Sequence, residues 1–432
     1  MEHFLERHKG HIEGAISGFD RVLFRGTLRT ISSRHGIERW LWYQGVLLSN
    51  FGAFAEKVSA KLKKHADQIA QKHARPFQYV ESPKQSKQEI ARKIMEKDKI
   101  VKGLICVLSC VEPCRTFKLE KDHRSKMLKL RPTTRQCLHL YFYYIDRDFG
   151  LMHVRLQTWL PFTIQVCING WDWLAQRLDR QGIGYEKRDN CFTHIDDIPR
   201  AQRMMDSLIE RKWIRWLDIL AKRCNPWLDP SNGLDLRGYY WSIREGEYST
   251  DVLFKSPHNL REIYPALLHH AIHHFSAKEV LRFLQRRLNI RSTGELKSEL
   301  TSRIEGVRIK HWVNENSIKM YDKQGCVLRI ETTINNPRRW NIRREVTRKG
   351  KQVMAWVPMR KGVSDIRRRV TISRTANERY LEALSVVGEQ LPACRVLDPV
   401  SKRLLCDGRP YRALRPISPE DSIIFSRNYS RS

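Results

Sequence analysis

Acidic residues and long apolar runs are both scarce in this chain of 432 residues. It carries 47 Asp and Glu against 79 Lys and Arg, which gives a formal net charge of +32. No run approaches the roughly 18 apolar residues that a membrane-crossing helix needs. The first residues, MEHFLERHKGHIEG, are charged where a secretion signal would be apolar. We therefore expect a cytoplasmic protein with no membrane partner.

Motifs that define several enzyme and metal-site classes are missing as well. The chain has no G-x-x-x-x-G-K-[ST] phosphate loop, no G-x-G-x-x-G and no G-x-S-x-G, so ATPase, dehydrogenase and serine-hydrolase functions have no support. The spacing of Cys106, Cys110 and Cys114 is not the paired C-x-x-C pattern of structural zinc sites. The histidines at 269, 270, 273 and 274 have no glutamate between them. We expect reduced, buried thiols and ordinary surface or half-buried histidines.

Apolar periodicity predicts both helices and strands. Helices are expected over 53–75, 85–98 and 199–223, and strands over 19–31 and 103–111. This mixture indicates an α+β fold with mixed or antiparallel sheets, hairpins and flanking helices, in two to three domains. The regions that we expect are an N-terminal α/β region (1–130), a β-hairpin and helical region (131–224), an α+β region that holds the candidate catalytic residues (238–345) and a basic C-terminal segment (346–432).

A hairpin is predicted over 137–159, where two alternating stretches flank a turn near Asp148. In this register three pairs of residues share one face: His139 with Gln157, Tyr141 with Arg155, and Tyr143 with His153. The opposite face is apolar. The polar face is either an ordinary solvated surface or a groove that binds nucleic acid.

Residues 338–374 contain thirteen Lys or Arg against two acids, with two tryptophans among them. Cationic side chains bind phosphates by releasing counterions, and indoles stack on unpaired bases, so nucleic acid is the expected partner. A solvated basic face or a tail is the alternative, although the segment also carries apolar residues. The candidate contacts here are Arg338, Arg339, Trp340, Arg343, Arg344, Trp356, Arg367, Arg368 and Arg369.

A second hairpin, KMYDKQGCVLRIETTI, begins at Lys319. Its alternation requires a loop of odd length, most simply residues 323–325, with Met320, Leu328 and Ile330 buried. The other face then presents Lys319, Tyr321, Arg329 and Glu331. Asp322 falls at the turn, where we expect it to shape the backbone.

This segment, Tyr321-Asp322-Lys323 followed by Arg329-Ile330-Glu331, resembles the strand pair of rolling-circle replication initiators of plasmids and filamentous phages. The resemblance covers about 13 residues. It implies a metal-bound carboxylate that polarises the scissile phosphate and a tyrosine that attacks it, leaving a 5′-phosphotyrosine link. The upstream stretch GVRIKHWV has no tyrosine, and the chain has no His-hydrophobe-His pair of the wider nickase class.

The candidate nucleophiles are the tyrosines, and the sequence does not choose between Tyr321, Tyr141, Tyr143, Tyr239 and Tyr240. Lys319 and Arg329 are neighbouring catalytic candidates. Mg²⁺ or Mn²⁺ prefers carboxylate oxygens in such chemistry. The carboxylates best placed on strands are Glu331, Asp20, and either Asp251 or Glu247. An ion pair with one of the many arginines is the plain alternative for each.

The leading hypothesis is therefore a metal-dependent DNA nickase or replication initiator of mobile-element type. A non-catalytic RNA- or DNA-binding protein is the main alternative, and divalent-metal dependence separates the two. A transcription regulator is less favoured, because no helix-turn-helix is recognised. DNA is favoured over RNA only through the short resemblance.

Overall fold

The computed structural model describes residues 1–121, 127–285, 296–303, 306–348, 350–387, 405–406 and 409–410. The chain divides into two units, Met1–Ser385 and Val386–Ser432. In the second unit, the described residues include a short strand pair, β16 (Leu405–Cys406) with β17 (Arg409–Pro410). The remainder of the predicted basic C-terminal segment beyond residue 387 lies outside the described residues.

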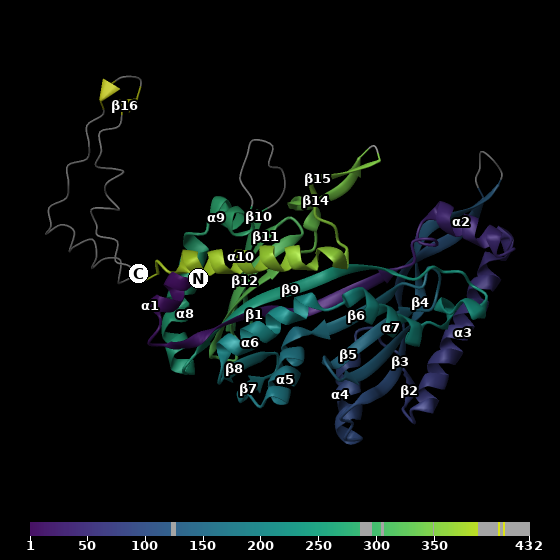
Figure 1. Cartoon of the computed structure of the whole chain (residues 1–432), viewed down its shortest axis with the longest axis horizontal. Helices are drawn as coiled ribbons and strands as arrows, with labels where there is room; N and C mark the ends of the chain where they lie inside the picture. The colour runs from purple at the N-terminus through teal and green to yellow at the C-terminus, as the bar shows by residue number, and fades with distance from the viewer. Residues whose placement is uncertain are drawn as a thin grey trace. The chain divides into compact units, whose positions relative to one another are not determined.

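An eleven-stranded sheet forms the centre of the first unit (Figure 1). Its strands, in the order in which they lie side by side, are β10 (Leu296–Arg303), β11 (Gly306–Val313), β12 (Asn316–Lys323), β13 (Val327–Thr333), β9 (Tyr240–Phe254), β1 (Ile12–Thr27), β6 (Ile164–Asn169), β5 (Gly150–Gln157), β4 (Leu128–Asp146), β3 (Gly103–Lys121) and β2 (Phe77–Tyr79). β2 runs parallel to β3, and the other neighbours are antiparallel. The sheet takes strands from the first three regions distinguished above.

The helices of the first unit are α1 (Glu2–Arg7), α2 (Arg34–Tyr43), α3 (Phe51–Lys72), α4 (Lys87–Lys97), α5 (Gly170–Gln181), α6 (Ile198–Ser207), α7 (Trp213–Cys224), α8 (Pro257–His273), α9 (Ala277–Phe283) and α10 (Ile366–Leu384). Two small hairpins complete it: β7 (Tyr185–Arg188) with β8 (Cys191–Ile195), and β14 (Asn341–Arg348) with β15 (Lys351–Pro358). This architecture confirms the predicted α+β class with flanking helices. Within the described residues, no helix is long and apolar enough to cross a membrane.

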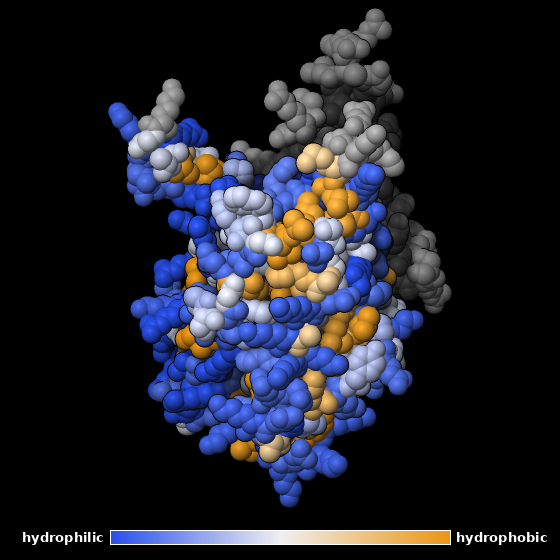
Figure 2. All heavy atoms as spheres, turned by 90° about the vertical axis from the view of Figure 1, so that its right-hand side faces the viewer, coloured by the Kyte–Doolittle hydropathy of each residue, from blue (hydrophilic) through white to orange (hydrophobic). Residues whose placement is uncertain are grey.

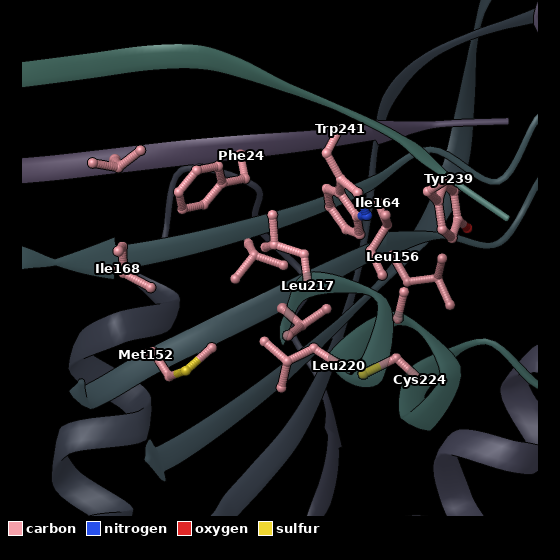
Figure 3. Packing of buried hydrophobic residues seen from close by; sticks show 14 of the residues in the cluster. Phe24, Met152, Leu156, Ile164, Ile168, Leu217, Leu220, Cys224, Tyr239 and Trp241 are labelled. Carbon is pink, nitrogen blue, oxygen red and sulfur yellow. The ribbon is translucent and has the colours of Figure 1, made fainter. Parts of the chain in front are cut away.

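Most of the core lies between one face of the sheet and the helices. Phe24, Ile164 and Ile168 of the sheet meet Leu217 and Leu220 of α7 (Figure 3). Each such side chain contributes about 1.5 to 3 kcal/mol when it is fully buried. The surface in Figure 2 is mostly hydrophilic, with separate hydrophobic patches. The residues that hold the sheet together are thus internal, as the alternation of the strands predicts.

The predicted helix over 199–223 is in fact two helices, α6 and α7. Arg211, between them, is extended, with φ −58° and ψ 143°. Trp213 then enters the core, where its ring lies 4.9 Å from that of Phe24 and 5.8 Å from that of Phe149. Tertiary packing of this indole therefore overrides a helical pattern that continues through the break in the sequence.

The first predicted hairpin register is confirmed in β4 and β5: Tyr141 pairs with Arg155. The pairs of His139 with Gln157 and of Tyr143 with His153 are confirmed as well. On this face α4 packs against β3, with Ala91 beside Leu108 and Cys110. One helix therefore covers a corner of the polar face and leaves the rest to form a groove.

The second hairpin shows the predicted faces but a different register. Tyr321 pairs with Arg329 and Lys319 pairs directly with Glu331, so the three-residue loop is 324–326 instead of 323–325. Met320, Leu328 and Ile330 are fully buried. The turn is shifted because Asp322 Oδ1 accepts a hydrogen bond of 2.9 Å from the amide of Gly325, which has φ +76°. Asp322 is thus a turn residue, as expected.

Candidate metal centre

The candidate site is formed in part by an irregularity in strand β1. Phe19 lies opposite Tyr248 and Val22 lies opposite Gly246, so Asp20 and Arg21 together face the single residue Glu247. Two residues against one is a β-bulge, which turns side chains away from the regular alternation. Phe19 and Val22 are both buried in the core. Asp20 and Arg21 are consequently directed to the polar side of the sheet.

Three carboxylates from adjacent strands meet there. One oxygen each of Asp20 (β1), Glu247 (β9) and Glu331 (β13) lies within 4.8 Å of the other two. Mg²⁺ and Ca²⁺ bind oxygens at about 2.0 to 2.6 Å, so oxygens less than about 5 Å apart can share one ion. Within the part of the chain that the structure describes, no other group of three or more acidic, His or Cys side chains meets this condition.

Asp251 is not part of this carboxylate cluster, and its expected role as a ligand is wrong. Both of its oxygens bind Arg329, from Nε and from Nη2, each at 2.6 Å. Nη1 of Arg329 binds Asp20 Oδ2 at 2.7 Å. Arg329 is completely buried, so it positions two aspartates and is not accessible to a substrate. Glu247, the alternative ligand, takes the place of Asp251.

Lys319 and Tyr321 approach Glu331 from β12. Lys319 Nζ lies 2.6 Å from Glu331 Oε1 and 3.9 Å from Glu247 Oε1. The Tyr321 hydroxyl donates a 2.9 Å hydrogen bond to Glu331 Oε2. The amide of Asn190, in the β7–β8 turn, donates to Asp20. The ammonium of Lys319, the phenol of Tyr321 and the side-chain amide of Asn190 thus surround the three carboxylates.

Negative charge is in slight excess at this place. The acids are Asp20, Glu245, Glu247, Asp251 and Glu331, and the bases paired with them are Arg329, Lys319 and Arg21, so five carboxyl groups face three basic side chains. Burial and then the charge of Glu331 raise the pKa of Glu247 to about 7. Burial and then Glu331 also raise the pKa of Tyr321 well above its ordinary value. A divalent cation would relieve the repulsion between the carboxylates.

Two hollows flank the carboxylate cluster. One, of about 570 Å³, is lined by Asp20 and Glu247 together with Arg21, His153 and Arg92 of α4. The other, of about 280 Å³, is lined by Lys319, Tyr321 and neighbouring basic residues. Asp189 lines both. The cluster is therefore reached from a polar groove.

The polar face of β4 and β5 divides into accessible and inaccessible residues. Tyr141 is buried, its hydroxyl donates to Glu112 Oε2 at 2.7 Å, and it lines neither hollow beside the carboxylate cluster. His139 and Gln157 are buried as well and contact backbone carbonyls. Tyr143 and His153 line the larger hollow, with ring centroids 5.1 Å apart.

The basic segment is only partly a surface, which corrects two of its predicted contacts. Trp340 is buried, and its indole donates to the carbonyl of Leu284 at 2.9 Å. Arg369 is 2 % exposed and donates to the carbonyl of Ile334. Arg344 pairs with Asp365 and Arg367 with Glu210. The exposed candidates are Arg338, Arg339, Arg343, Arg367, Arg368 and Trp356, of which Arg343 and Trp356 lie opposite each other in the β14–β15 hairpin (Figure 1).

Two residues of the site escaped the sequence reasoning. Arg21 reaches the polar side only because of the bulge, and Asn190 reaches Asp20 only because the β7–β8 turn folds over β13. Neither has a sequence signal. The histidines at the end of α8 form ring pairs, His269 with His273 at 4.3 Å and His270 with His274 at 4.6 Å, and belong to no metal group among the described residues.

No protein-family model matches the chain, and neither a curated protein nor a solved structure is significantly similar to it. The site therefore has to be interpreted from its own chemistry.

Proposed function

We propose that the protein is a metal-dependent enzyme that cleaves a phosphodiester bond of nucleic acid, with Tyr321 as nucleophile. The observation that carries this proposal is the meeting of Asp20, Glu247 and Glu331 within 4.8 Å, beside a tyrosine hydroxyl, in a chain with a net charge of +32. A strongly basic protein attracts nucleic acid, whose phosphate backbone is a polyanion. Clustered carboxylates suit a hard divalent cation.

The donor set fits Mg²⁺ or Mn²⁺. The three ligands are all carboxylates, and Glu331 Oε1 is buried with an ion pair to Lys319 but no partner in hydrogen-bond geometry. When bound, the cation would polarise the phosphate and stabilise negative charge on its oxygens. The ammonium of Lys319 lies 2.6 Å from Glu331 Oε1, so this ammonium would have to move away for a metal ion to bind the same oxygen.

The chemistry of the residues is a transesterification. Tyr321 Oη would form a bond to phosphorus while the bond from phosphorus to the 3′-oxygen breaks. Glu331 Oε2, 2.9 Å from the phenol oxygen, is the group positioned to accept the phenolic proton. Lys319, once displaced from Glu331, is the nearest acid to protonate the leaving 3′-oxygen. The product is a 5′-phosphotyrosyl link and a free 3′-hydroxyl.

A non-catalytic nucleic-acid-binding protein is the second candidate. It is favoured by the 2.6 Å ion pair between Lys319 and Glu331, which already satisfies one carboxylate without a metal. In that case the carboxylate cluster is a buried ion-pair network that fixes the sheet, and binding would need no divalent cation.

The test is incubation of the purified chain with end-labelled single-stranded DNA, duplex DNA and RNA, with Mn²⁺, Mg²⁺ or EDTA. The proposal expects cleavage in Mn²⁺ or Mg²⁺ only, and a covalent protein–nucleic acid adduct. Glu331→Gln should abolish cleavage and keep binding, because the amide retains the shape but loses the charge. Arg203→Gln, an exposed change on α6, is the control.

The outcomes separate the two candidates. Metal-independent binding without any cleavage would replace the enzyme by the binding protein. Cleavage by Glu331→Gln at the parental rate would remove the carboxylate cluster from the mechanism. Cleavage without an adduct would assign the attack to water and leave Tyr321 a positioning residue.

A further inference from the structure

Four arginines gather on the polar face beside the candidate metal centre, and none is explained by the chemistry above. Arg25 of β1 lies opposite Gln165 of β6, and Gln165 lies opposite Arg155 of β5, so the three side chains form one row across three strands. Arg244, at an irregularity of β9, and Arg115 of β3 are the other two members. We call these four residues the arginine cluster.

Most of the positive charge of the arginine cluster is uncompensated. Within the described residues, the side chains of Arg25, Arg115 and Arg244 form no hydrogen bond or ion pair. Arg155 has a carboxylate partner, Glu112, at 2.5 Å, which it shares with Lys87 at 3.0 Å.

Arg25 is the most constrained member. Its Nε is buried without a partner, although a guanidinium normally finds an acceptor in that situation. Burial and then the positive charges of the three other arginines lower the pKa of Arg25. Like charges held close together in this way cost free energy unless an anion joins them. The arrangement is therefore that of an anion site.

Its position relates the anion to the candidate metal centre. Arg25 is four residues beyond Arg21 on the same strand, which corresponds to about 13 Å along an extended chain. The hollow of about 570 Å³ is lined by Arg21, by the carboxylates Asp20 and Glu247 and by α4, and no member of the arginine cluster is among its lining residues.

We propose that the arginine cluster binds the backbone phosphates of single-stranded nucleic acid, at a fixed distance from the bond that the carboxylate cluster cleaves. The proposal deepens the proposed function, because it assigns the substrate class and the direction in which the strand leaves the metal centre. Arginine suits this role since its planar fork donates two parallel hydrogen bonds to a phosphate.

The experiment measures binding in EDTA, so that cleavage plays no part. Fluorescent oligothymidylates of about two to eight nucleotides are titrated with the parent chain, the double variant Arg25→Gln/Arg244→Gln and the control Arg203→Gln. We expect the parental affinity to rise with length. The double variant should lose this gain, with about tenfold weaker binding of the longest oligonucleotide, and the magnitude of its salt slope should fall by about 1.4.

Each other result overturns the inference. Equal affinity and equal salt slope of the double variant would exclude the arginine cluster from binding. Tighter binding of a duplex would exclude the single strand, and full competition by inorganic phosphate or a mononucleotide would reduce the cluster to a small-anion site. Melting temperatures of all variants show whether the fold is intact.

The proposed function can fail separately. Length-dependent binding without metal-dependent cleavage would leave the arginine cluster as a binding groove and remove the enzyme. Cleavage that is unaffected by Arg25→Gln/Arg244→Gln in both rate and cut position would keep the enzyme and exclude the arginine cluster from substrate binding.

Discussion

The Tyr321 hydroxyl donates a hydrogen bond of 2.9 Å to Glu331, although the two residues are diagonal and not opposite on their strands. The residue opposite Glu331 is Lys319, whose ammonium forms an ion pair of 2.6 Å with the other carboxylate oxygen. One carboxylate therefore holds a phenol and an ammonium at once. This relationship makes the hairpin the most informative place for mutation.

Tyr321→Phe should abolish the covalent adduct while binding of Mn²⁺ remains within about twofold, because the phenol is no ligand of the carboxylate cluster. Denaturing electrophoresis of the reaction with labelled single-stranded DNA measures the adduct, and calorimetry measures the metal. Tyr143→Phe, in the same groove, is the control. An adduct of normal yield in Tyr321→Phe would show that another nucleophile is used.

Mn²⁺ should stabilise the folded chain by occupying the carboxylate cluster. At a concentration of 100 times the dissociation constant, a ligand that binds only the folded state adds about 2.7 kcal/mol to the free energy of unfolding. Glu247→Gln should remove most of this increment, as measured by denaturant unfolding with and without Mn²⁺. Glu245→Gln, two residues along β9, is the matched control, since Glu245 pairs only with Arg21. An unchanged increment in Glu247→Gln would contradict the assignment.

Arg329→Met should destabilise the protein by about 3 to 5 kcal/mol, because Asp20 and Asp251 would be left as buried carboxylates without their positively charged partner. Urea unfolding measures the loss. If Asp251→Asn is added, a neutral amide replaces one of the orphaned charges, and part of the lost stability should return. An exposed arginine such as Arg203 should tolerate methionine with little change.

Stability should fall in mild acid because of buried neutral histidines. Burial lowers the pKa of both His139 and His311 to about 4, whereas an unfolded histidine has a pKa of about 6.5. Between these values the unfolded chain binds more protons, so this stability is complete above about pH 6.5 and is lost as the pH falls toward 4. Each histidine contributes a slope of up to about 1.4 kcal/mol per pH unit.

The measurement for this prediction is urea unfolding at about pH 7 and about pH 5. His311→Asn should flatten the pH dependence, whatever it does to stability at pH 7. A dependence as steep as in the parent would mean that His311 titrates normally in the folded state.

The basic segment should separate into binding and structural arginines. Arg368→Ala, an exposed change, should reduce the magnitude of the salt slope of DNA binding by about 0.7 to 0.9 if it contacts a phosphate, with stability nearly unchanged. Arg369→Ala removes a buried side chain and should lower the melting temperature instead. The reverse pattern, with Arg369 affecting binding alone, would contradict its burial.

Alternation along strands predicted much of the fold and part of the site. The pairs Tyr141 with Arg155 and Tyr321 with Arg329 both lie on polar faces as expected, because a buried opposite face leaves a strand only one orientation. Glu331 and Asp20 do lie together. The sequence could not choose Glu247 over Asp251, since that choice depends on which carboxylate Arg329 binds.

Long-range packing and local irregularities explain the remaining differences. Trp340 is an indole in a basic segment, and only the folded chain places it in the interior, where it donates to the carbonyl of Leu284. The arginine cluster needs strands β9, β1, β5 and β3 to lie in the same part of one sheet, with β6 and β4 between them, and nothing in the spacing of its members indicates this order.

The β1 bulge contains a single surplus residue, so its effect is that of an insertion. Without Arg21, the order Phe19, Asp20, Val22, Leu23, Phe24 would alternate regularly, with Phe19, Val22 and Phe24 still in the core and Asp20 still directed outward. One codon thus decides whether the carboxylate of Asp20 has the guanidinium of Arg21 beside it on the same face. Gain or loss of that codon would change the positive charge beside the carboxylate cluster by one.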